Sequence, residues 1–173
     1  DLKPYSPDGE DMGFMTSGDE TGQQFTLYGT SQEAPIDFKQ NKAKLTSGRQ
    51  FTQEDFDSGA LVVIINQEFA KENGLQLGSK FSLKATIDEH NLETGDVAAS
   101  AEREEEFEVI GLYEIVESQN KKSSSPMDAY MDSEKYNKIY TTNTVIVDFD
   151  QWMYDEYAKT TDFAQMGLTR DNY

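Results

Sequence analysis

The sequence predicts an α+β fold with more strand than helix, in which mixed or antiparallel sheets and short helices form two small lobes. Three observations predict this fold. Ala60–Ile65 is apolar at every position and rich in β-branched residues, Phe81–Ile87 alternates apolar and polar residues, and the segment between them has the signals of a short helix. The length of 173 residues fits one domain or two small domains packed together.

The N-terminal part of the chain predicts little regular structure. Residues 1–24 are rich in Gly, Asp, Ser and Pro, which is typical of loops. Phe25–Thr30 is a predicted strand, and Ala34–Gly48 is a mixed connector with one helical turn. The acidic stretch that starts at Ser47 is interpreted as a polar loop that leads into the apolar run.

The apolar run and the segment after it form the best-defined unit. Ala60–Ile65 predicts a strand that is buried on both faces. Asn66 can cap the following helix, and Gly74 can end it because glycine readily adopts the left-handed conformation. Phe69 and Ala70 are expected to face the core.

The next two strands are expected to form an antiparallel hairpin. Phe81–Ile87 alternates cleanly, and Phe107–Val116 reads as a long strand with apolar residues on both faces. Gly111, in the middle of that strand, predicts a bulge or a close approach of another backbone. Asp88–Glu106, between the strands, is interpreted as a polar loop that contains the single histidine, His90.

The last third of the chain is less regular. Ser118–Asp128 reads as a loop, Ala129–Asn143 as a short helix or turns, and Thr144–Phe149 as a strand. Phe149, Trp152, Met153 and Tyr157 have helical spacing, which predicts an amphipathic helix. The expected organisation is therefore a loop-rich segment (1–24), a core lobe (25–116) and a second part (117–173) that completes a second lobe.

Charge and composition exclude several classes of function. The formal net charge is −18, and this field repels phosphates, so we expect no nucleic-acid partner. There is no cysteine, which excludes a thiol nucleophile and a disulfide scaffold. No apolar run approaches the roughly 20 residues that span a bilayer. Because the chain begins at Asp1 without Met or a signal peptide, we interpret it as a piece of a longer protein.

The search for catalytic or metal-binding motifs favours a protein that is not an enzyme and needs no cofactor. His90 lies among carboxylates and is interpreted as a solvated side chain rather than a catalytic base. The acidic clusters indicate a solvated face, although paired carboxylates of a secreted hydrolase stay open as an alternative. Ser6–Gly13, Ser17–Gly22 and Val147–Asp150 offer oxygen ligands without the spacing of a calcium loop, so ordinary turns are favoured.

Several segments resemble, in order and spacing, the MacB-like periplasmic core domain, the extracytoplasmic domain of MacB-like and FtsX-like ABC-transporter permeases. The resemblance covers Phe25 to Val116 well and departs from the family in the polar insert at Asp88–Glu106 and in residues 1–24. It is carried by Gly48, Arg49, Phe51, Thr52 and Asp55 in a G-R-x-F-T-x-x-D segment, Leu61–Ile65 in the apolar strand, Gly74 and Gly78 around the helix end, and Phe107, Val109, Ile110 and Gly111 in an F-x-V-I-G strand.

The resemblance implies a non-catalytic outer domain, inserted between the first two transmembrane helices of a permease. Its implied partners are those helices, a cytoplasmic ATP-binding-cassette subunit, a second copy in a dimeric transporter, and a peptide or lipid substrate. The implied location is the extracellular side of a cell membrane, and the absence of cysteine favours a Gram-positive surface. Arg49 and Asp55 are expected to make local hydrogen bonds. The alternative is a surface module that binds cell-wall carbohydrate or peptide through aromatic clusters such as Tyr130–Tyr140.

Overall fold

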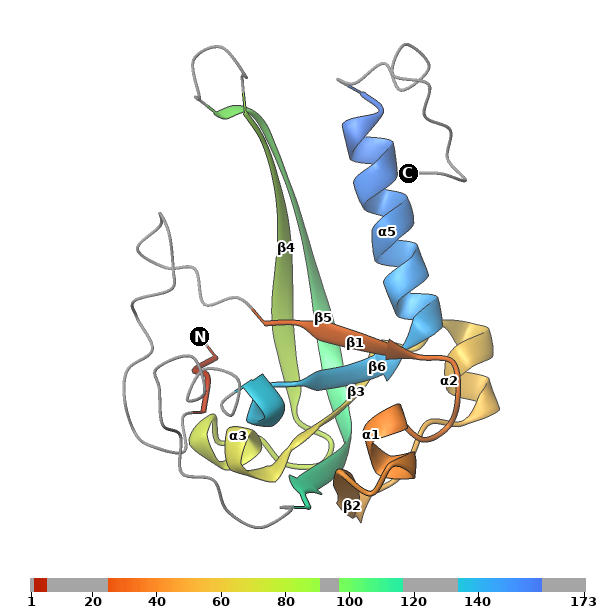
Figure 1. Cartoon of the computed structure of the whole chain (residues 1–173). Helices are drawn as coiled ribbons and strands as arrows, with labels where there is room; N and C mark the ends of the chain where they lie inside the picture. The colour runs from red at the N-terminus through yellow and green to blue at the C-terminus, as the bar shows by residue number, and fades with distance from the viewer. Residues whose placement is uncertain (1, 6–24, 91–96, 117–133, 160–173) are drawn as a thin grey trace.

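The computed structural model describes residues 2–5, 25–90, 97–116 and 134–159, and these form an α+β fold built on one mixed sheet (Figure 1). The strands are β1 (Leu27–Thr30), β2 (Ala43–Gly48), β3 (Val62–Asn66), β4 (Lys80–His90), β5 (Val97–Ile115) and β6 (Ile139–Thr142). The helices are α1 (Ile36–Lys39), α2 (Gln53–Ser58), α3 (Gln67–Glu72) and α5 (Asn143–Tyr157). The predicted fold class is confirmed.

The strand order in the sheet is β1-β6-β3-β5-β2, with β4 paired to β5. β1 runs parallel to β6 and β3 runs parallel to β5, whereas β3–β6, β2–β5 and β4–β5 are antiparallel. Thus β6, which comes from the C-terminal third, lies between two strands of the N-terminal part. The predicted boundary between two lobes stays a prediction.

The unit around β3 confirms the sequence interpretation. All five residues of β3 are buried. The side chain of Asn66 accepts a hydrogen bond of 2.8 Å from the Glu68 amide at the start of α3. Gly74, just beyond the C-cap of α3, has a φ of 63°, in the left-handed region predicted for it. Phe69 and Ala70 of α3 are both buried.

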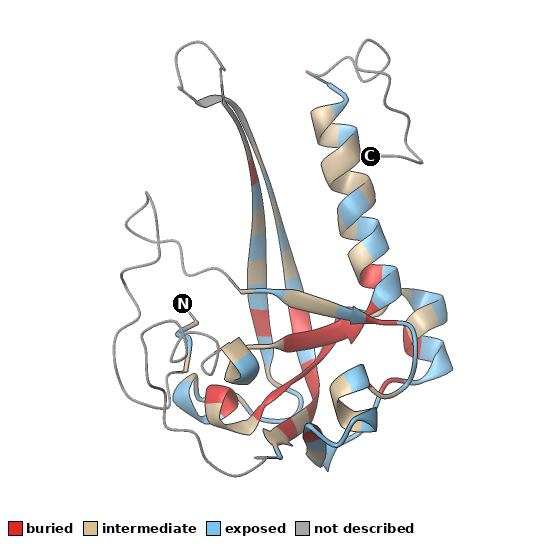
Figure 2. Cartoon of the chain, in the orientation of Figure 1, coloured by how far each residue is buried: buried red, intermediate tan, exposed pale blue. Residues whose placement is uncertain are grey.

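Two apolar clusters cover opposite faces of the sheet. Alternate residues of a strand point to opposite faces. In β3, Val63 and Ile65 belong to the cluster that contains Phe69 and Phe107, while Val62 and Ile64 belong to the other. Figure 2 shows the buried residues concentrated where β3, β5 and β6 run together. The antiparallel hairpin of β4 and β5 projects from this core.

The predicted polar loop at Asp88–Glu106 is wrong over most of its length. β4 continues to His90, and β5 already begins at Val97, so that only residues 91–96 lie outside the described residues. The alternation continues into this segment, since Arg103 and Glu105 are half-buried whereas the side chains on either side of them are exposed. Lys80 pairs with Glu106 and Lys84 pairs with Glu102 across the hairpin. Opposite-charge pairs across the strands stabilise the hairpin, so a polar segment can form two strands here instead of the predicted loop.

The strand predicted at Thr144–Phe149 is also wrong, because these residues form the first half of α5. The helix predicted from Phe149 therefore exists but begins six residues earlier, at Asn143. The preceding four residues form β6 and fill the place between β1 and β3. Val145 is buried and Phe149 packs against the same cluster four residues later, which is the spacing of one helix face.

Three short elements fall in segments that the sequence interpretation treated as irregular. β2 occupies the end of the predicted connector, α2 lies inside the predicted acidic loop, and β6 lies inside Ala129–Asn143, where a short helix or turns were predicted. The single helical turn predicted in the connector is α1. The two acidic N-terminal segments considered for calcium lie outside the described residues, and Val147–Asp150 lies in α5 rather than in a turn.

Candidate functional site

Most of the motif residues identified in the sequence gather around one point of β5. The amide of Arg49 donates to the carbonyl of Ile110 at 3.0 Å on one side. The amide of Gly78 donates to the carbonyl of Val109 at 2.8 Å. The segments 48–49 and 78–79 therefore both hold β5 beside Gly111. Gly74 differs from the other motif residues in that it ends α3.

Gly48 and Gly111 allow β2 and β5 to approach closely. They face each other in the β2–β5 ladder. A Cβ atom at Gly111 would lie 2.8 Å from the carbonyl oxygen of Arg49, and a Cβ at Gly48 would lie 2.2 Å from the carbonyl oxygen of Ile110. The pairing of β3 with β5 shifts register between Val63 and Ile64, opposite this point. The bulge or close approach predicted at Gly111 is confirmed.

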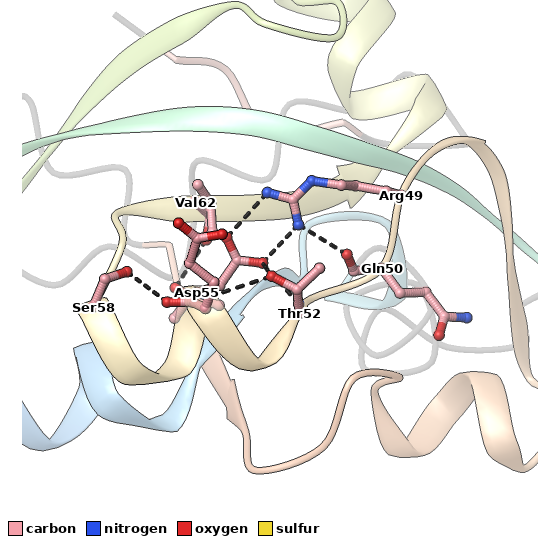
Figure 3. Close-up of polar contacts among 8 residues, drawn as sticks. Arg49, Gln50, Thr52, Asp55, Ser58 and Val62 are labelled. Atoms are coloured by element: carbon pink, nitrogen blue, oxygen red, sulfur yellow. Dashed lines mark hydrogen bonds and ion pairs between the residues drawn. The ribbon is translucent and has the colours of Figure 1, made fainter.

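Arg49 and Asp55 pair directly with each other (Figure 3). The two guanidinium nitrogens of Arg49 donate to the two carboxylate oxygens of Asp55 at 2.6 and 3.0 Å. The Asp55 side chain is only 7% exposed, whereas that of Arg49 is 47% exposed. We call Arg49, Thr52 and Asp55 the Arg49 clasp. Its geometry agrees with the local hydrogen bonding expected of Arg49 and Asp55.

Thr52 makes the clasp part of a helix start. The Thr52 hydroxyl accepts from the Asp55 amide at 3.4 Å, and the Thr52 amide donates to the Asp55 carboxylate at 2.7 Å. These two bonds form the capping box of α2, with Asp55 as its third helical residue. The T-x-x-D spacing is a signal that could have identified this helix, although the sequence interpretation treated the segment as a loop.

Electrostatics keep the clasp charged. The hydrogen bonds from Arg49 lower the pKa of Asp55, and partial burial acts in the opposite direction. Hydrogen bonds from Thr52 lower this pKa further. The pairing with Asp55 in turn raises the pKa of Arg49. A carboxylate that is ionised and fully engaged in this way serves to fix the segment between β2 and β3, and it has no free proton to transfer.

A second connection joins the hairpin to α5 through Arg103. Its Nε donates to Glu105 at 2.9 Å, its guanidinium pairs with the carboxylate of Asp148, and its central carbon lies 4.5 Å from the centre of the Phe149 ring. The Arg103 side chain is half-buried. We did not select this residue from the sequence, although a single basic residue within Glu102–Glu108 is a signal that could have found it.

A third polar cluster lies between α1 and β6. The ammonium group of Lys138 lies 3.0 Å from Oδ2 of Asp37, and the Tyr140 hydroxyl donates to the same oxygen. Burial alone would raise the pKa of Asp37, but the hydrogen bonds from Tyr140 and Lys138 outweigh it and lower that pKa. Burial raises the pKa of Tyr140, and neighbouring Tyr113 and Asp37 raise it further. Sequence reasoning missed this cluster because its members are about a hundred residues apart.

The described part of the chain contains no group of three or more His, Cys, Asp or Glu side chains placed to hold a metal ion. Within the same residues, no helix is both long enough and apolar enough to cross a membrane. His90, considered as a general base, lies at the end of β4.

The molecule is thus a small α+β domain with one mixed sheet, a projecting hairpin and most of its motif residues close to Gly111 on β5. Residues 5–168 match the sequence profile of the MacB-like periplasmic core domain, so the chain belongs to this family.

A curated relative points to the same class of protein. The chain is 27% identical, over 128 residues, to the uncharacterised ABC transporter permease YclI of Bacillus subtilis (strain 168). The aligned region covers 74% of this chain but only 22% of the relative. The chain therefore corresponds to roughly one part in five of that permease.

Proposed function

We propose that the chain is the non-catalytic outer domain of an ABC-transporter permease, where it transmits the motion of membrane helices to a substrate or an extracytoplasmic partner. The family and the permease relative support this proposal. The proposed partners are transmembrane helices of the same protein, a cytoplasmic ATP-binding-cassette subunit and a second copy of the permease. The proposed location is the outer face of a cell membrane, and a Gram-positive surface stays a prediction.

The observation that carries the mechanical part of the proposal is the continuity of β5. This strand has 19 residues, which corresponds to roughly 60 Å of extended chain. Its C-terminal part is held between β2 and β3 in the core, and its N-terminal part is one side of the projecting hairpin. A displacement of the core must therefore move the hairpin with it.

Arg103 adds a second route between the hairpin and the rest of the domain. It fixes β5 to Asp148 and Phe149 on α5, and Phe149 packs against the core cluster. A displacement of α5 would therefore reach the hairpin through Arg103. We therefore infer that the hairpin and α5 move together.

This chain contains no cysteine, so within it a spin label attaches only to an introduced cysteine, and any cysteines elsewhere in the parent permease and its ATPase are first replaced by serine. In the parent permease with its ATPase, labels at the exposed Glu104 of the hairpin and Asp155 of α5 should keep a constant distance between nucleotide-free and ATP-bound states. The distance from Glu104 to the partner copy should change. Arg103→Met should broaden the first distance distribution, whereas Lys84→Met, on the outer hairpin face, should not.

A hairpin that keeps the same position relative to the membrane and the partner copy in both states would refute motion transmission. The permease assignment can be checked separately by sequencing the parent gene on both sides of this domain. Apolar stretches of roughly 20 residues on both sides of this domain are expected, next to a gene for an ATP-binding cassette. A signal peptide before the domain and a cell-wall anchor after it would contradict the permease assignment.

A further inference from the structure

A hollow of about 400 Å³ opens beside the Asp37 cluster, between the end of β1, the bend after it and the start of α1. Sites for small molecules typically measure about 300–1,000 Å³. The wall of this hollow carries Tyr28, Asp37, Lys138 and Tyr140, and neither the Arg49 clasp nor the hairpin contributes to it. The proposed motion transmission gives it no role.

The charged pair in the wall offers an acceptor and a donor side by side. The Asp37 and Lys138 side chains are 17% and 24% exposed, so both keep some access to solvent. Among the described residues, both hydrogen bonds to the carboxylate end on Oδ2, from Lys138 and from Tyr140. An ammonium group has three N–H donors, and the one described hydrogen bond from Lys138 uses a single donor. Oδ1 of Asp37 and the other donors of Lys138 can therefore serve a ligand.

The charge of the wall selects the kind of ligand. A cation would have to displace Lys138 from Asp37, and an anion would have to displace Asp37 from Lys138. An anion would also be repelled by a chain whose formal net charge is −18. A neutral ligand that donates one hydrogen bond and accepts another can join the pair without separating it. Two hydroxyl groups on adjacent carbon atoms have this arrangement.

The rest of the hollow suits the apolar face of a sugar ring. Ala34, Pro35 and Ile36 form one side of it, and the Ile36 side chain is exposed, at 61%. The half-buried ring of Tyr28 lies on the wall, with the Lys138 ammonium 5.0 Å from its centre. Aromatic and aliphatic surfaces around a few convergent polar groups are the usual composition of a small-molecule site.

We propose that this hollow binds a sugar unit of a neutral saccharide through a vicinal diol, with one hydroxyl donating to Asp37 and its neighbour accepting from Lys138. Lys138 and Tyr140 both belong to the aromatic cluster Tyr130–Tyr140, from which the sequence suggested a carbohydrate-binding surface. The inference is independent of motion transmission, because it concerns a different face of the sheet and different residues.

The test is a titration of the isotopically labelled chain, followed by NMR, with four neutral disaccharides: maltose, lactose, trehalose and N,N′-diacetylchitobiose. At least one should shift the backbone amides of Gly29, Ser31, Gln32 and Ile36, with saturation by about 10 mM, tenfold above a dissociation constant of 1 mM. Lys138→Met should weaken this binding at least tenfold and leave the remaining spectrum intact. Lys44→Met is the matched control, since Lys44 also pairs with a carboxylate but lies on β2.

The outcomes separate this proposal from its competitors. No shift at these amides with any of the four sugars would overturn it. Equal binding of permethylated maltose, which has no hydroxyl donors, would overturn it in favour of simple apolar contact. Saturable binding of spermidine or inorganic phosphate at the same amides, with none of the sugars, would overturn it in favour of a charged ligand. Diol-dependent binding lost in Lys138→Met would support it, whatever happens in the spin-label experiment on the permease.

Discussion

Asp55 provides the sharpest test of the Arg49 clasp, because one carboxylate serves both the ion pair and the capping box. It accepts from the two guanidinium nitrogens of Arg49, and from the amide and the hydroxyl of Thr52. Loss of a cap costs typically about 1 kcal/mol. The pair with Arg49 is half-exposed and adds about 1 kcal/mol after allowance for solvent screening. We therefore expect Asp55→Ala to lower the free energy of unfolding by about 2 kcal/mol.

The pairwise part of this effect can be isolated with a double-mutant cycle. Arg49→Met removes the ion pair but leaves the Thr52 bonds to a carboxylate that is almost buried. The double variant should lose less stability than the sum of the two single variants, with a coupling of about 1 kcal/mol.

The assay is urea unfolding followed by circular dichroism, with the slope of the transition as a check that the unfolded state is unchanged. Gln53→Ala is a suitable control, because Gln53 is on the same helix but is exposed and bonds only to Asp57 among the described side chains. It should change stability by less than about 0.5 kcal/mol. Strict additivity of the Arg49 and Asp55 effects, or an Asp55→Ala variant as stable as the wild type, would refute the clasp as a stabilising unit.

Three further predictions concern the backbone at Gly74 and Gly48 and the charge of Asp55. Gly74→Val should destabilise the fold by about 1 kcal/mol or more, because a β-branched residue is strained at the observed φ of 63°; Gly74→Asn should lose less, and an unchanged melting temperature would count against the position of the α3 end. Gly48→Ala should lower the free energy of unfolding by about 3 kcal/mol and Gly74→Ala by about 1 kcal/mol. The reason is that a Cβ atom at Gly48 would lie 2.2 Å from the Ile110 carbonyl oxygen, whereas a Cβ at Gly74 would have no neighbour within 4 Å. Equal melting temperatures of the two variants would contradict this. Because folding lowers the pKa of Asp55, the stability that its carboxylate contributes is complete above the unfolded pKa of about 3.9 and is lost as the pH falls through the folded pKa. The wild type should therefore lose more stability than Asp55→Asn between about pH 5 and pH 2. Parallel curves of unfolding free energy against pH for the two proteins would argue against the pairing.

The signals that succeeded are local. A continuous apolar run predicted the buried strand β3. A strand that is covered on both faces needs apolar side chains at every position, whichever elements cover it. Asn66 and Gly74 predicted the two ends of α3, because caps depend on the conformation of only a few residues. Gly111 predicted the close approach on β5, although the residue that approaches it, Arg49, could not be named in advance.

The signals that failed depend on partners distant in the sequence. Thr144–Phe149 has the β-branched residues of a strand, but β6 already fills the place between β1 and β3, and the spacing of Val145 and Phe149 allows a helix to cover the core instead. Asp88–Glu106 reads as a polar loop until the fold brings Lys80 and Lys84 of β4 to Glu106 and Glu102 of β5. Polarity alone could not distinguish an exposed hairpin from a loop, because both are solvated.

The sequence by itself determined the fold class, the β3–α3–β4–β5 order and the family to which the chain belongs, because all of these depend on local patterns and their spacing. Only the tertiary structure brought Asp37 to Lys138 and Arg103 to Asp148, since the members of these pairs are 101 and 45 residues apart in the sequence. Charged side chains of this kind have no periodicity to identify them. Their pairing is decided by which strands become neighbours in the sheet, and that choice is made by burial of the whole core.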